Sequence, residues 1–380
     1  MRKLSVLIFI FLSACTSVRI NHVSQIKKIN KNTYVYTLPK TVIGIEITVK
    51  KIIFVPGPYS SFAEKYLGIE QADTNNYTNY YFENISINSL LKADSGHVYV
   101  VQYKNRLPWK SIVQRSDGVI LSVNCPKEEI TNTPYSTDIS YVNNYKSLSD
   151  DMYLEMSKTG FIKERTDTTY KQIRIDTNWV RVPVTKKVSE AMTMEEKAKE
   201  AAELIMDLRQ RRYDLFSGDY EMLPQGEAAT SIANELNAQE EKYLSLFVGK
   251  YFESYQTFYI ELEPTNPYQK NYMVAYFGKK SGLTIDSVTK DAKPIVLSVN
   301  LNDAWLPYSK MLLKYQKAKQ VNAFTYRMPQ KTQVTLLYDY KKLYEKEIEL
   351  YQFGKRIYMP VSFLKNHSFR LDNPDYIIIQ

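Results

Sequence analysis

The sequence contains few of the residues that usually carry enzyme chemistry. Its 380 residues include only two cysteines, three histidines and 12 glycines. The histidines, His22, His97 and His367, form no H-x-H or H-x-x-x-H pair, which excludes a metal site with local histidine spacing. The glycines form no G-x-G-x-x-G or Walker loop, and no G-x-S-x-G elbow marks a serine nucleophile. We therefore expect no metal, no cofactor and no catalytic site with a recognisable motif.

A pair of carboxylates is the one catalytic arrangement that leaves no local motif. A glycosidase brings two acids together in space from any positions in the chain. The sequence has 41 aspartates and glutamates, and no feature distinguishes a pair among them. A carbohydrate- or peptidoglycan-active hydrolase of this kind is therefore the alternative to a protein without catalytic activity.

Long apolar runs are also absent, and no segment is long enough to span a membrane. At the N-terminus, Arg2 and Lys3 precede an apolar run from Leu4 to Leu12. This run is about half of the roughly 20 residues that a spanning helix needs. A short basic region followed by a short apolar run and small residues is typical of a secretion signal.

The residues Leu12-Ser13-Ala14-Cys15 resemble the bacterial lipobox. The resemblance implies cleavage before Cys15 and transfer of a diacylglycerol to its thiol, so that acyl chains anchor the mature protein to a membrane. We predict a lipoprotein signal peptide at 1–14 and a polar, lipid-anchored tether at 15–30, with no transmembrane helix in the mature chain. A secretion signal with an incidental cysteine is the alternative.

Acylation of Cys15 would leave Cys125 as the only free thiol of the mature chain. No intramolecular disulfide could then form, and stability would depend on packed cores. Cys125 follows an apolar run, which predicts a buried side chain rather than a nucleophile.

The residues behind the anchor and the overall charge indicate where the protein lies and what it meets. The segment Thr16-Ser17-Val18-Arg19 has no aspartate that would retain it in the inner membrane and no acidic cluster typical of surface-exposed lipoproteins. We predict the outer membrane, with the domains facing the periplasm. The net charge of +9 favours anionic partners such as acidic glycans or lipid headgroups. Nucleic acid is not expected as a partner, since no dense basic stripe with interleaved aromatics is present.

The hydrophobic pattern predicts an α+β chain that is predominantly β. From residue 31 to 189, apolar residues alternate with polar ones, as at Ile43, Ile45 and Ile47, which is the period of a half-buried strand. From 190 to 250 the spacing changes to three and four residues, which predicts an antiparallel helical hairpin that begins with a capping box at Thr193–Glu196. The two-residue period returns from 251 to 380. We expect two domains of antiparallel sandwich or barrel-like β structure with the helical hairpin inserted between them.

The segment PGPYSSFAEKYLGIE interrupts the first β domain and has two interpretations. It predicts a turn, a capping box at Ser61–Glu64, a short helix and a left-handed helix end at Gly68. In the first interpretation Tyr59, Phe62 and Tyr66 form an exposed aromatic interaction surface. In the second, Phe62 and Tyr66 share one face of the helix and cover the first sheet.

Four segments of the chain resemble the DUF4831 family of Bacteroidota lipoproteins. They are TLPKTVIGIEITVKK, PGPYSSFAEKYLGIE, RQRRYDLFSGDYEMLPQGEA and EEKYLSLFVGK, and the resemblance extends from about residue 34 to the C-terminus. The family has no established function, so the resemblance implies no catalytic or binding residues. It does imply the lipid anchor and an origin in the Bacteroidota. In that phylum a periplasmic O-glycosylation consensus of Asp, then Ser or Thr, then an aliphatic residue or Thr is common, which marks Thr168 and Ser287 as candidate sites.

These observations together favour a protein without catalytic activity. We expect an accessory or binding component at the outer membrane that engages an envelope protein or an envelope glycan.

The predicted anchor can be tested by substitution of Cys15. We expect the wild-type protein to incorporate labelled palmitate and to partition into a detergent phase, because its acyl chains are apolar. Cys15→Ser removes the thiol that accepts the diacylglycerol, so the label is lost and the protein moves to the aqueous phase. Cys125→Ser is the matched control and keeps the label. Palmitate on the Cys15→Ser protein would contradict the lipobox interpretation.

Overall fold

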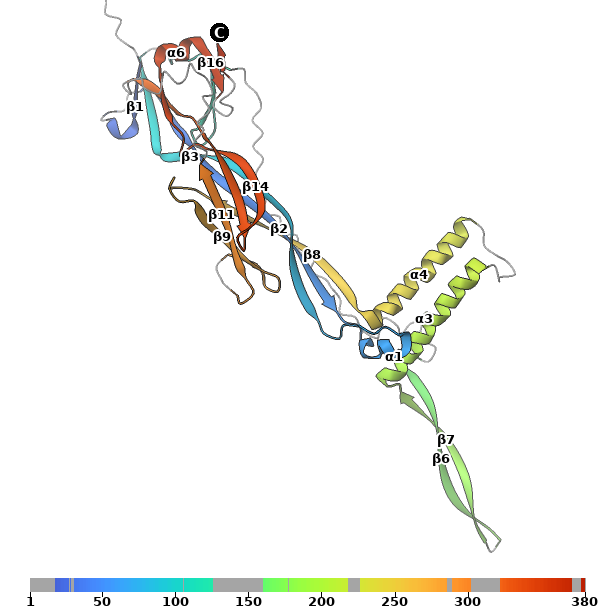
Figure 1. The fold of residues 1–380 in the computed structure, drawn as a ribbon. Coiled ribbons are helices and arrows are strands. Elements are labelled where there is room, and N and C mark those ends of the chain that lie inside the picture. The colour runs from blue at the N-terminus through green and yellow to red at the C-terminus, as the bar shows by residue number, and fades with distance from the viewer. Residues whose placement is uncertain are drawn as a thin grey trace, which may run out of the picture. The chain divides into compact units, whose positions relative to one another are not determined.

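The computed structural model describes residues 18–26, 28, 31–104, 106–125, 160–176, 178–217, 226–285, 289–301, 322–370 and 377–379 (Figure 1). The predicted signal peptide, Cys15 and the candidate glycosylation site Ser287 lie outside these residues. Within them the chain is mostly antiparallel β sheet, with one pair of long helices packed together. The predicted α+β class, predominantly β, is confirmed.

The first sheet has four strands in the order β1-β3-β2-β8. They are β1 (Val18–His22), β2 (Thr33–Val55), β3 (Tyr77–Tyr103) and β8 (Lys250–Leu262). β1 pairs antiparallel with β3 and is followed by a single 3-10 turn, η1 (Val23–Gln25). Val18 and Ile20 are buried because alternate residues of a strand point to one face. The predicted tether at 15–30 is thus corrected for residues 18–22, whose pairing partner lies far along the chain and leaves no local signal.

Strands within residues 112–123 and 271–379 form three further sheets in the described part of the chain. The largest is a sheet in the order β10-β9-β11-β13-β14, whose neighbouring strands run antiparallel. Its strands are β9 (Asn271–Gly278), β10 (Gly282–Thr284), β11 (Lys293–Leu301), β13 (Gln330–Tyr338) and β14 (Lys341–Leu350). β12 (Ala323–Arg327) pairs with β15 (Arg356–Pro360), and α6 (Val361–Asn366) follows β15. The last sheet has the order β17-β16-β5-β4, with β4 (Ile112–Gln114), β5 (Ile120–Val123), β16 (His367–Arg370) and β17 (Ile377–Ile379).

An aromatic stack joins β2, β3 and β12 in the core. The ring of Tyr36 lies between those of Tyr99 and Phe324, with centroid distances of 5.5 and 4.8 Å. The Tyr36 hydroxyl donates to the carbonyl oxygen of Thr325 at 3.1 Å and accepts from the backbone N–H of Thr325 at 3.0 Å. Burial raises the pKa of Tyr36 well above its ordinary value, so this phenol stays neutral. Cys125 is also buried, as predicted.

The chain forms two compact units that alternate along the sequence. The described residues of one unit fall within 1–49, 82–139 and 257–380, and those of the other fall within 50–81 and 140–256. The boundaries fall inside β2, β3 and β8 rather than at the ends of the predicted segments 31–189, 190–250 and 251–380. The two units differ from the predicted segments because β2, β3 and β8 share one sheet although they are distant in the sequence. Local periodicity does not show such pairing.

In the second unit, α3 (Met194–Ser217) and α4 (Glu227–Val248) pack against each other, which confirms the predicted helical hairpin. The capping box at the start of α3 is also confirmed. The backbone N–H of Thr193 donates to the Glu196 carboxylate at 2.8 Å, and the N–H of Glu196 donates to the Thr193 hydroxyl at 3.3 Å. Buried Glu240 of α4 accepts from Arg209, at 2.6 Å, and from Arg212 of α3. These ion pairs hold the two helices together.

The segment PGPYSSFAEKYLGIE forms a 3-10 turn, η2 (Ser60–Phe62), which is followed by a single helical turn, α1 (Ala63–Leu67). Gly68 ends α1 at φ 67°, as predicted for a left-handed helix end. The predicted capping box at Ser61–Glu64 is wrong. Ser61 lies inside η2, and the residue before α1, Phe62, makes no side-chain capping bond.

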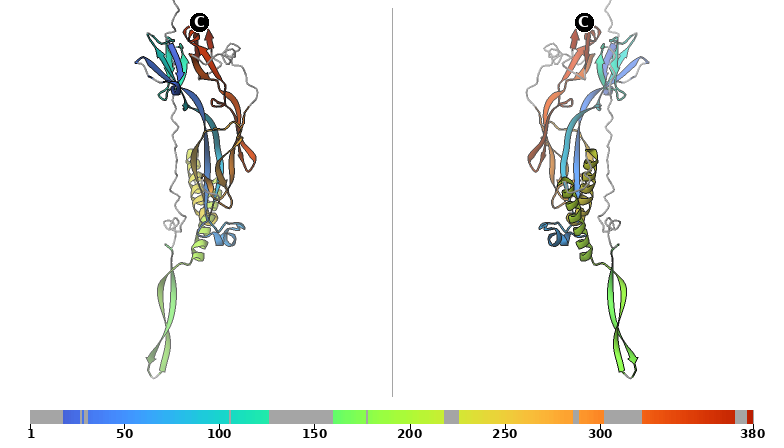
Figure 2. Two further views of the ribbon diagram at one scale, coloured as in Figure 1. Left: turned by 90° about the vertical axis from the view of Figure 1, so that its left-hand side faces the viewer. Right: turned by 90° about the vertical axis from the view of Figure 1, so that its right-hand side faces the viewer.

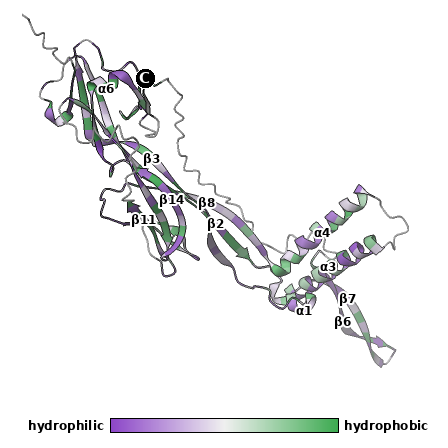
Figure 3. Cartoon of the chain, turned by 45° about the horizontal axis from the view of Figure 1, so that its top comes forward, coloured by the Kyte–Doolittle hydropathy of each residue, from purple (hydrophilic) through white to green (hydrophobic). Residues whose placement is uncertain are grey.

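The second unit also contains a long hairpin of β6 (Ile162–Ile175) and β7 (Asn178–Ala191), and among the described strands these two pair only with each other. They twist around one another in both views of Figure 2. Hydrophobic and hydrophilic residues both occur along their length (Figure 3).

The capping box yields a stability prediction. Thr193→Ala removes the hydroxyl that accepts the Glu196 N–H, and loss of such a cap costs about 1 kcal/mol. We expect the free energy of unfolding of the second unit, measured in urea, to fall by about that amount. Thr193→Ser keeps the hydroxyl and retains most of the stability. Equal losses in both variants would show that the capping bond is not the cause.

Candidate ligand-binding site

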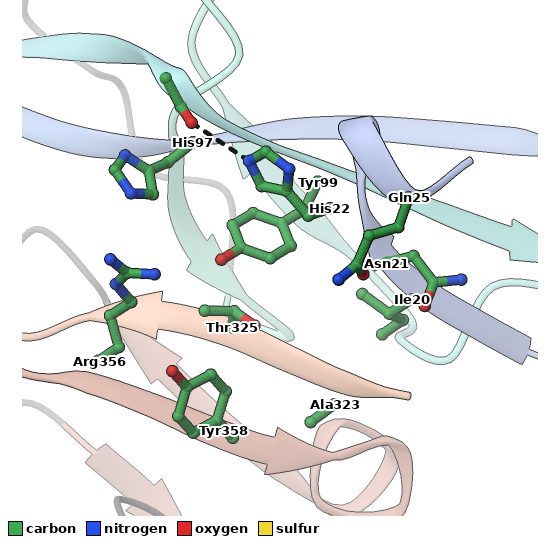
Figure 4. A pocket seen from close by; sticks show the side chains of 11 residues that line it. Ile20, Asn21, His22, Gln25, His97, Tyr99, Ala323, Thr325, Arg356 and Tyr358 are labelled. Carbon is green, nitrogen blue, oxygen red and sulfur yellow. Dashed lines mark hydrogen bonds between the residues drawn. The ribbon is translucent and has the colours of Figure 1, made fainter. Parts of the chain in front are cut away.

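A pocket of about 470 Å³ lies in the first unit, between β1 and β3 on one side and β12 and β15 on the other (Figure 4). Eight of its eleven lining residues carry a side chain that can form hydrogen bonds. The lining residues are Ile20, Asn21, His22, Gln25, Gly96, His97, Tyr99, Ala323, Thr325, Arg356 and Tyr358. Its volume falls in the range of about 300–1,000 Å³ that is typical of small-molecule sites.

The two-residue period of a strand explains how these side chains meet. Each of the four strands contributes two residues that are two positions apart and therefore point to the same face. They are Ile20 and His22, His97 and Tyr99, Ala323 and Thr325, and Arg356 and Tyr358. The pairing of β1 with β3 sets His22 opposite Tyr99, and the pairing of β12 with β15 sets Thr325 opposite Tyr358.

Both ring nitrogens of His22 are occupied. The backbone carbonyl of Gly96 can only accept, so Nε2 donates to it, at 3.2 Å. Nδ1 then accepts from the backbone N–H of Ser24 at 3.3 Å and from its hydroxyl at 2.8 Å. His22 thus shapes the pocket wall, and its ring stands edge-on to Tyr99 with centroids 5.4 Å apart.

His97 has one occupied nitrogen. Its Nδ1 donates to the Asp94 carboxylate at 2.9 Å, which leaves Nε2 as the acceptor of the neutral ring. The same Asp94 oxygen accepts from Arg327 at 2.7 Å, and the Arg327 guanidinium also donates to the carbonyl oxygen of Pro39 at 3.1 Å. The Arg327 side chain is 4% exposed, so Asp94 serves as the counter-ion of a buried charge.

Arg356 is the cation without such a counter-ion. It stands directly opposite Arg327 in the β12–β15 pair, so both side chains leave the ribbon on the same face. Within the part of the chain that the structure describes, no carboxylate lies within ion-pair distance of Arg356. The guanidinium lies on the His97 side of the pocket in Figure 4. Of the two arginines, Asp94 therefore pairs with Arg327 alone, and the second, Arg356, faces the pocket.

These charges shift two pKa values. Burial opposes ionisation of Asp94, but the hydrogen bond and charge of Arg327 outweigh it and hold the pKa of Asp94 below its ordinary value. Burial, and then the charge of Arg327, lower the pKa of His97, which Asp94 only partly restores. Arg356 also lowers the pKa of His97. His97 is therefore neutral at pH 7, with Nε2 able to accept a hydrogen bond.

The aromatic segment singled out in the sequence is not part of this pocket. Tyr59 is fully buried beside Phe247, and its backbone N–H donates to the carbonyl oxygen of Leu246 at 2.8 Å. Phe62 and Tyr66 are half-buried and pack on the same core. The exposed interaction surface predicted for Tyr59, Phe62 and Tyr66 is therefore corrected. The residues cover the helices, not the first sheet, because they lie beside α3 and α4 in the second unit.

The remaining predictions concern glycosylation, metal binding and membrane-spanning helices. Thr168 lies on β6 and is exposed, so its hydroxyl is accessible for glycosylation. Among the described residues, no three histidine, cysteine or acidic side chains gather into a metal site. No helix that the structure describes has both the length and the apolar character to cross a membrane.

The pocket residues belong to no local sequence motif. His22 and His97 form no spaced pair in the sequence, whereas their ring centroids lie 6.3 Å apart in the structure. Arg356 carries no motif either. The one available signal is the two-residue spacing of His97 and Tyr99 and of Arg356 and Tyr358, which places each pair on one strand face.

The pKa of His97 gives a test of this geometry. We expect its imidazole to titrate below the value of about 6.5 that is usual for histidine. Arg356→Gln removes one of the positive charges that lower this pKa and moves it upward. Titration of the imidazole by NMR, with the resonance assigned through His97→Gln, measures both effects. Arg19→Gln, at an exposed position of β1, is the control.

The same pKa shift predicts how stability depends on pH. The folded chain binds this proton less readily than the unfolded chain, so the contribution of His97 is present above about pH 6.5. It is lost as the pH falls through that value toward the lower folded pKa. A His97 pKa above 6.5, or one that does not respond to Arg356→Gln, would contradict the described charge arrangement.

Comparisons with known proteins bear on the identity of the chain. Comparisons with curated proteins and with solved structures found no match. Residues 32–371 match a protein family described as a domain of unknown function, DUF4831. The match covers most of the chain and confirms the resemblance found in the four sequence segments. The chain therefore belongs to the DUF4831 family.

Proposed function

We propose that the protein is a binding component of the bacterial cell envelope, without catalytic activity, and that its pocket takes up an acidic glycan. The observation that supports this proposal is the pairing of Arg356 with Arg327. Asp94 neutralises only Arg327, and like charges that face each other across a strand pair are unfavourable. An anionic ligand in the pocket would supply the missing negative charge beside Arg356.

The groups around Arg356 suit a sugar that carries a carboxylate. A guanidinium presents a planar fork that matches the two oxygens of a carboxylate. The Nε2 atom of His97 can accept from a sugar hydroxyl, because Nδ1 is held by Asp94. The phenol of Tyr99 and the amides of Asn21 and Gln25 add donors and acceptors around the lining. A pocket this polar favours a polar ligand over an apolar one.

The cellular location is part of the same proposal. Acylation of Cys15 would anchor the protein in the outer membrane, with the domains toward the periplasm. The lipobox-like residues Leu12–Cys15 and the absence of acids directly after Cys15 support this location. Acidic glycans of the envelope are within reach of a protein anchored there.

The pocket gives less support to a hydrolase. A glycosidase needs two carboxylates, one of which has a raised pKa and acts as the acid. No lining residue of the pocket, as drawn from the described residues, is a carboxylate. Asp94 lies behind His97, is bound to Arg327 and has a lowered pKa, which is the opposite of what a general acid requires.

A pair of matched ligands tests the proposal. We expect the protein to bind an oligosaccharide of uronic acids at pH 7 and low salt, and to bind the carboxyl-reduced form of the same oligosaccharide much more weakly. Arg356→Ala removes the charge-assisted hydrogen bonds and is expected to weaken binding of the acidic form about 10- to 150-fold. Arg356→Lys keeps the charge but not the planar fork and has an intermediate affinity. Titration calorimetry measures the affinity of the unsubstituted protein, of Arg356→Ala and of Arg356→Lys.

Arg19→Ala is the matched control, since Arg19 is an exposed arginine on β1 that does not line the pocket. It leaves the affinity unchanged. Equal binding of the acidic and reduced oligosaccharides, or an unchanged affinity of Arg356→Ala, would overturn the proposal. Release of new reducing ends that an acid-to-amide substitution abolishes would favour the hydrolase instead.

A further inference from the structure

The hairpin of β6 and β7 exposes nearly all of its side chains. Each strand has 14 residues, and only Lys163 and Val182 are partly covered. A hairpin of two strands is marginally stable in water unless something packs against it. Exposed apolar surface that is concentrated in one place marks an interaction site. The distribution of charge and apolar groups along this hairpin indicates what it contacts.

The half of the hairpin nearest α3 carries four cations, Lys163, Arg165, Lys186 and Lys187, and three acids, Glu164, Asp167 and Glu190, and Glu196 of α3 adds a fourth acid. Lys163 stands opposite Glu190 and also donates to Glu196 of α3 at 2.6 Å. Asp167 stands opposite Lys186, and Glu164 binds Lys187 at 2.9 Å. Opposite charges that face each other across a strand pair stabilise the hairpin itself. With Glu196 included, the cations and acids of this half are therefore equal in number.

The other half, residues 170–176 and 178–183, is here called the tip surface. It carries three cations, Lys171, Arg174 and Arg181, against the single acid Asp176. Its large apolar side chains are also exposed, with Trp179 and Tyr170 each at 66% and Ile175 at 54%. Ile173 and Val180 add aliphatic surface between them. The tip surface is thus cationic and apolar at once.

The apolar groups of the tip surface point to both sides of the hairpin. Paired residues of an antiparallel ladder share a face, so Trp179 lies on the face of Arg174. Ile173 and Val180 are paired with each other on the opposite face. A groove in a protein would cover one of these faces and leave the other in water. A layer that surrounds the end of the hairpin covers both.

We propose that the tip surface binds a membrane surface that carries anionic headgroups. Tryptophan beside aliphatic residues and cations is the composition that settles at the boundary between headgroups and acyl chains. The excess positive charge of Lys171, Arg174 and Arg181 complements anionic lipid. No described strand pairs with the outer edges of β6 and β7, and the backbone groups there need hydration, so only the end of the hairpin enters the boundary layer and no strand crosses it.

The size of the tip surface agrees with this occupant. A specific protein interface usually contains about 20–30 residues on each side. The tip surface contains fewer, and the charge-balanced half of the hairpin does not extend it. Membrane association needs less area, because a few apolar side chains and cations act together. This inference goes beyond the proposed glycan binding and depends neither on the pocket nor on the lipid at Cys15.

Vesicle binding tests the proposal. The mature chain from residue 15 carries Cys15→Ser, so that no acyl chain contributes. We expect it to sediment with vesicles that contain phosphatidylglycerol and phosphatidylcholine, and not with vesicles of phosphatidylcholine alone. The combined substitution of Lys171, Arg174 and Arg181 by Gln removes three cations and is expected to weaken binding on the order of a hundredfold. Trp179→Ser weakens it by removing the largest apolar group.

Two matched controls separate this surface from other causes. Lys186→Gln with Lys187→Gln removes cations of the charge-balanced half, and Tyr340→Ser removes a side chain that is 88% exposed outside the hairpin. Both bind vesicles nearly as the parent does, and Arg356→Ala also binds normally because the pocket is not involved. Circular dichroism checks that each variant is folded.

The spectroscopic signature is a blue shift of tryptophan emission on binding anionic vesicles, absent in Trp179→Phe. Equal binding to neutral and anionic vesicles, or tip variants that bind like the controls, would overturn the proposal. Absence of binding to both vesicle types, together with binding of a protein through the tip surface, would overturn it as well.

Discussion

The first unit depends on the hydroxyl of one buried tyrosine. Tyr36 of β2 satisfies both backbone groups of Thr325 on β12, and its ring fills the space between Tyr99 and Phe324. A buried N–H or C=O left without a partner costs about 1–3 kcal/mol, so the phenol holds β12 at a fixed position against β2 and β3. Tyr99 and Thr325 both line the pocket. The contact between Tyr36 and Thr325 therefore packs the core and also sets the distance across the candidate site.

The second constraint on the pocket is electrostatic. β12 and β15 place two arginines side by side, and the interior provides one aspartate. Arg327 is the deeper of the two and takes that aspartate, because a buried charge without a counter-ion is far more costly than an exposed one. Arg356 faces the pocket and stays exposed to an incoming anion. Asp94 at the same time orients His97, so one carboxylate determines both the charge and the hydrogen-bonding state of the pocket wall.

The second unit also contains both paired charges and cations without a carboxylate partner. Glu240 between Arg209 and Arg212 joins α3 to α4, and in the nearer half of the β6–β7 hairpin Lys163 and Asp167 each face an opposite charge. At the tip surface three cations accompany a single acid, and there Trp179 is exposed beside Arg174. In both units the proposed contacts lie where a cation has no carboxylate within ion-pair distance among the described residues.

The sequence by itself determined the features that depend on near neighbours. The α+β class, the helical hairpin, its capping box at Thr193 and the helix end at Gly68 follow from residues within a few positions of one another. The match to the DUF4831 family confirmed the resemblance carried by four short segments. The lipid anchor at Cys15 is likewise a local motif, and it stays a prediction because Cys15 lies outside the described residues.

Only the tertiary structure decided which distant residues meet. Residues 18–22 have the composition of a tether, yet they form a strand because β3 offers an edge to pair with. The sequence around Tyr59 allows an exposed aromatic side chain, yet Tyr59 is buried because α4 packs over it. His22, His97 and Arg356 reach one pocket through strand pairings between residues far apart in the sequence. Strand register over such separations is a property of the whole fold, and no local period of the sequence encodes it.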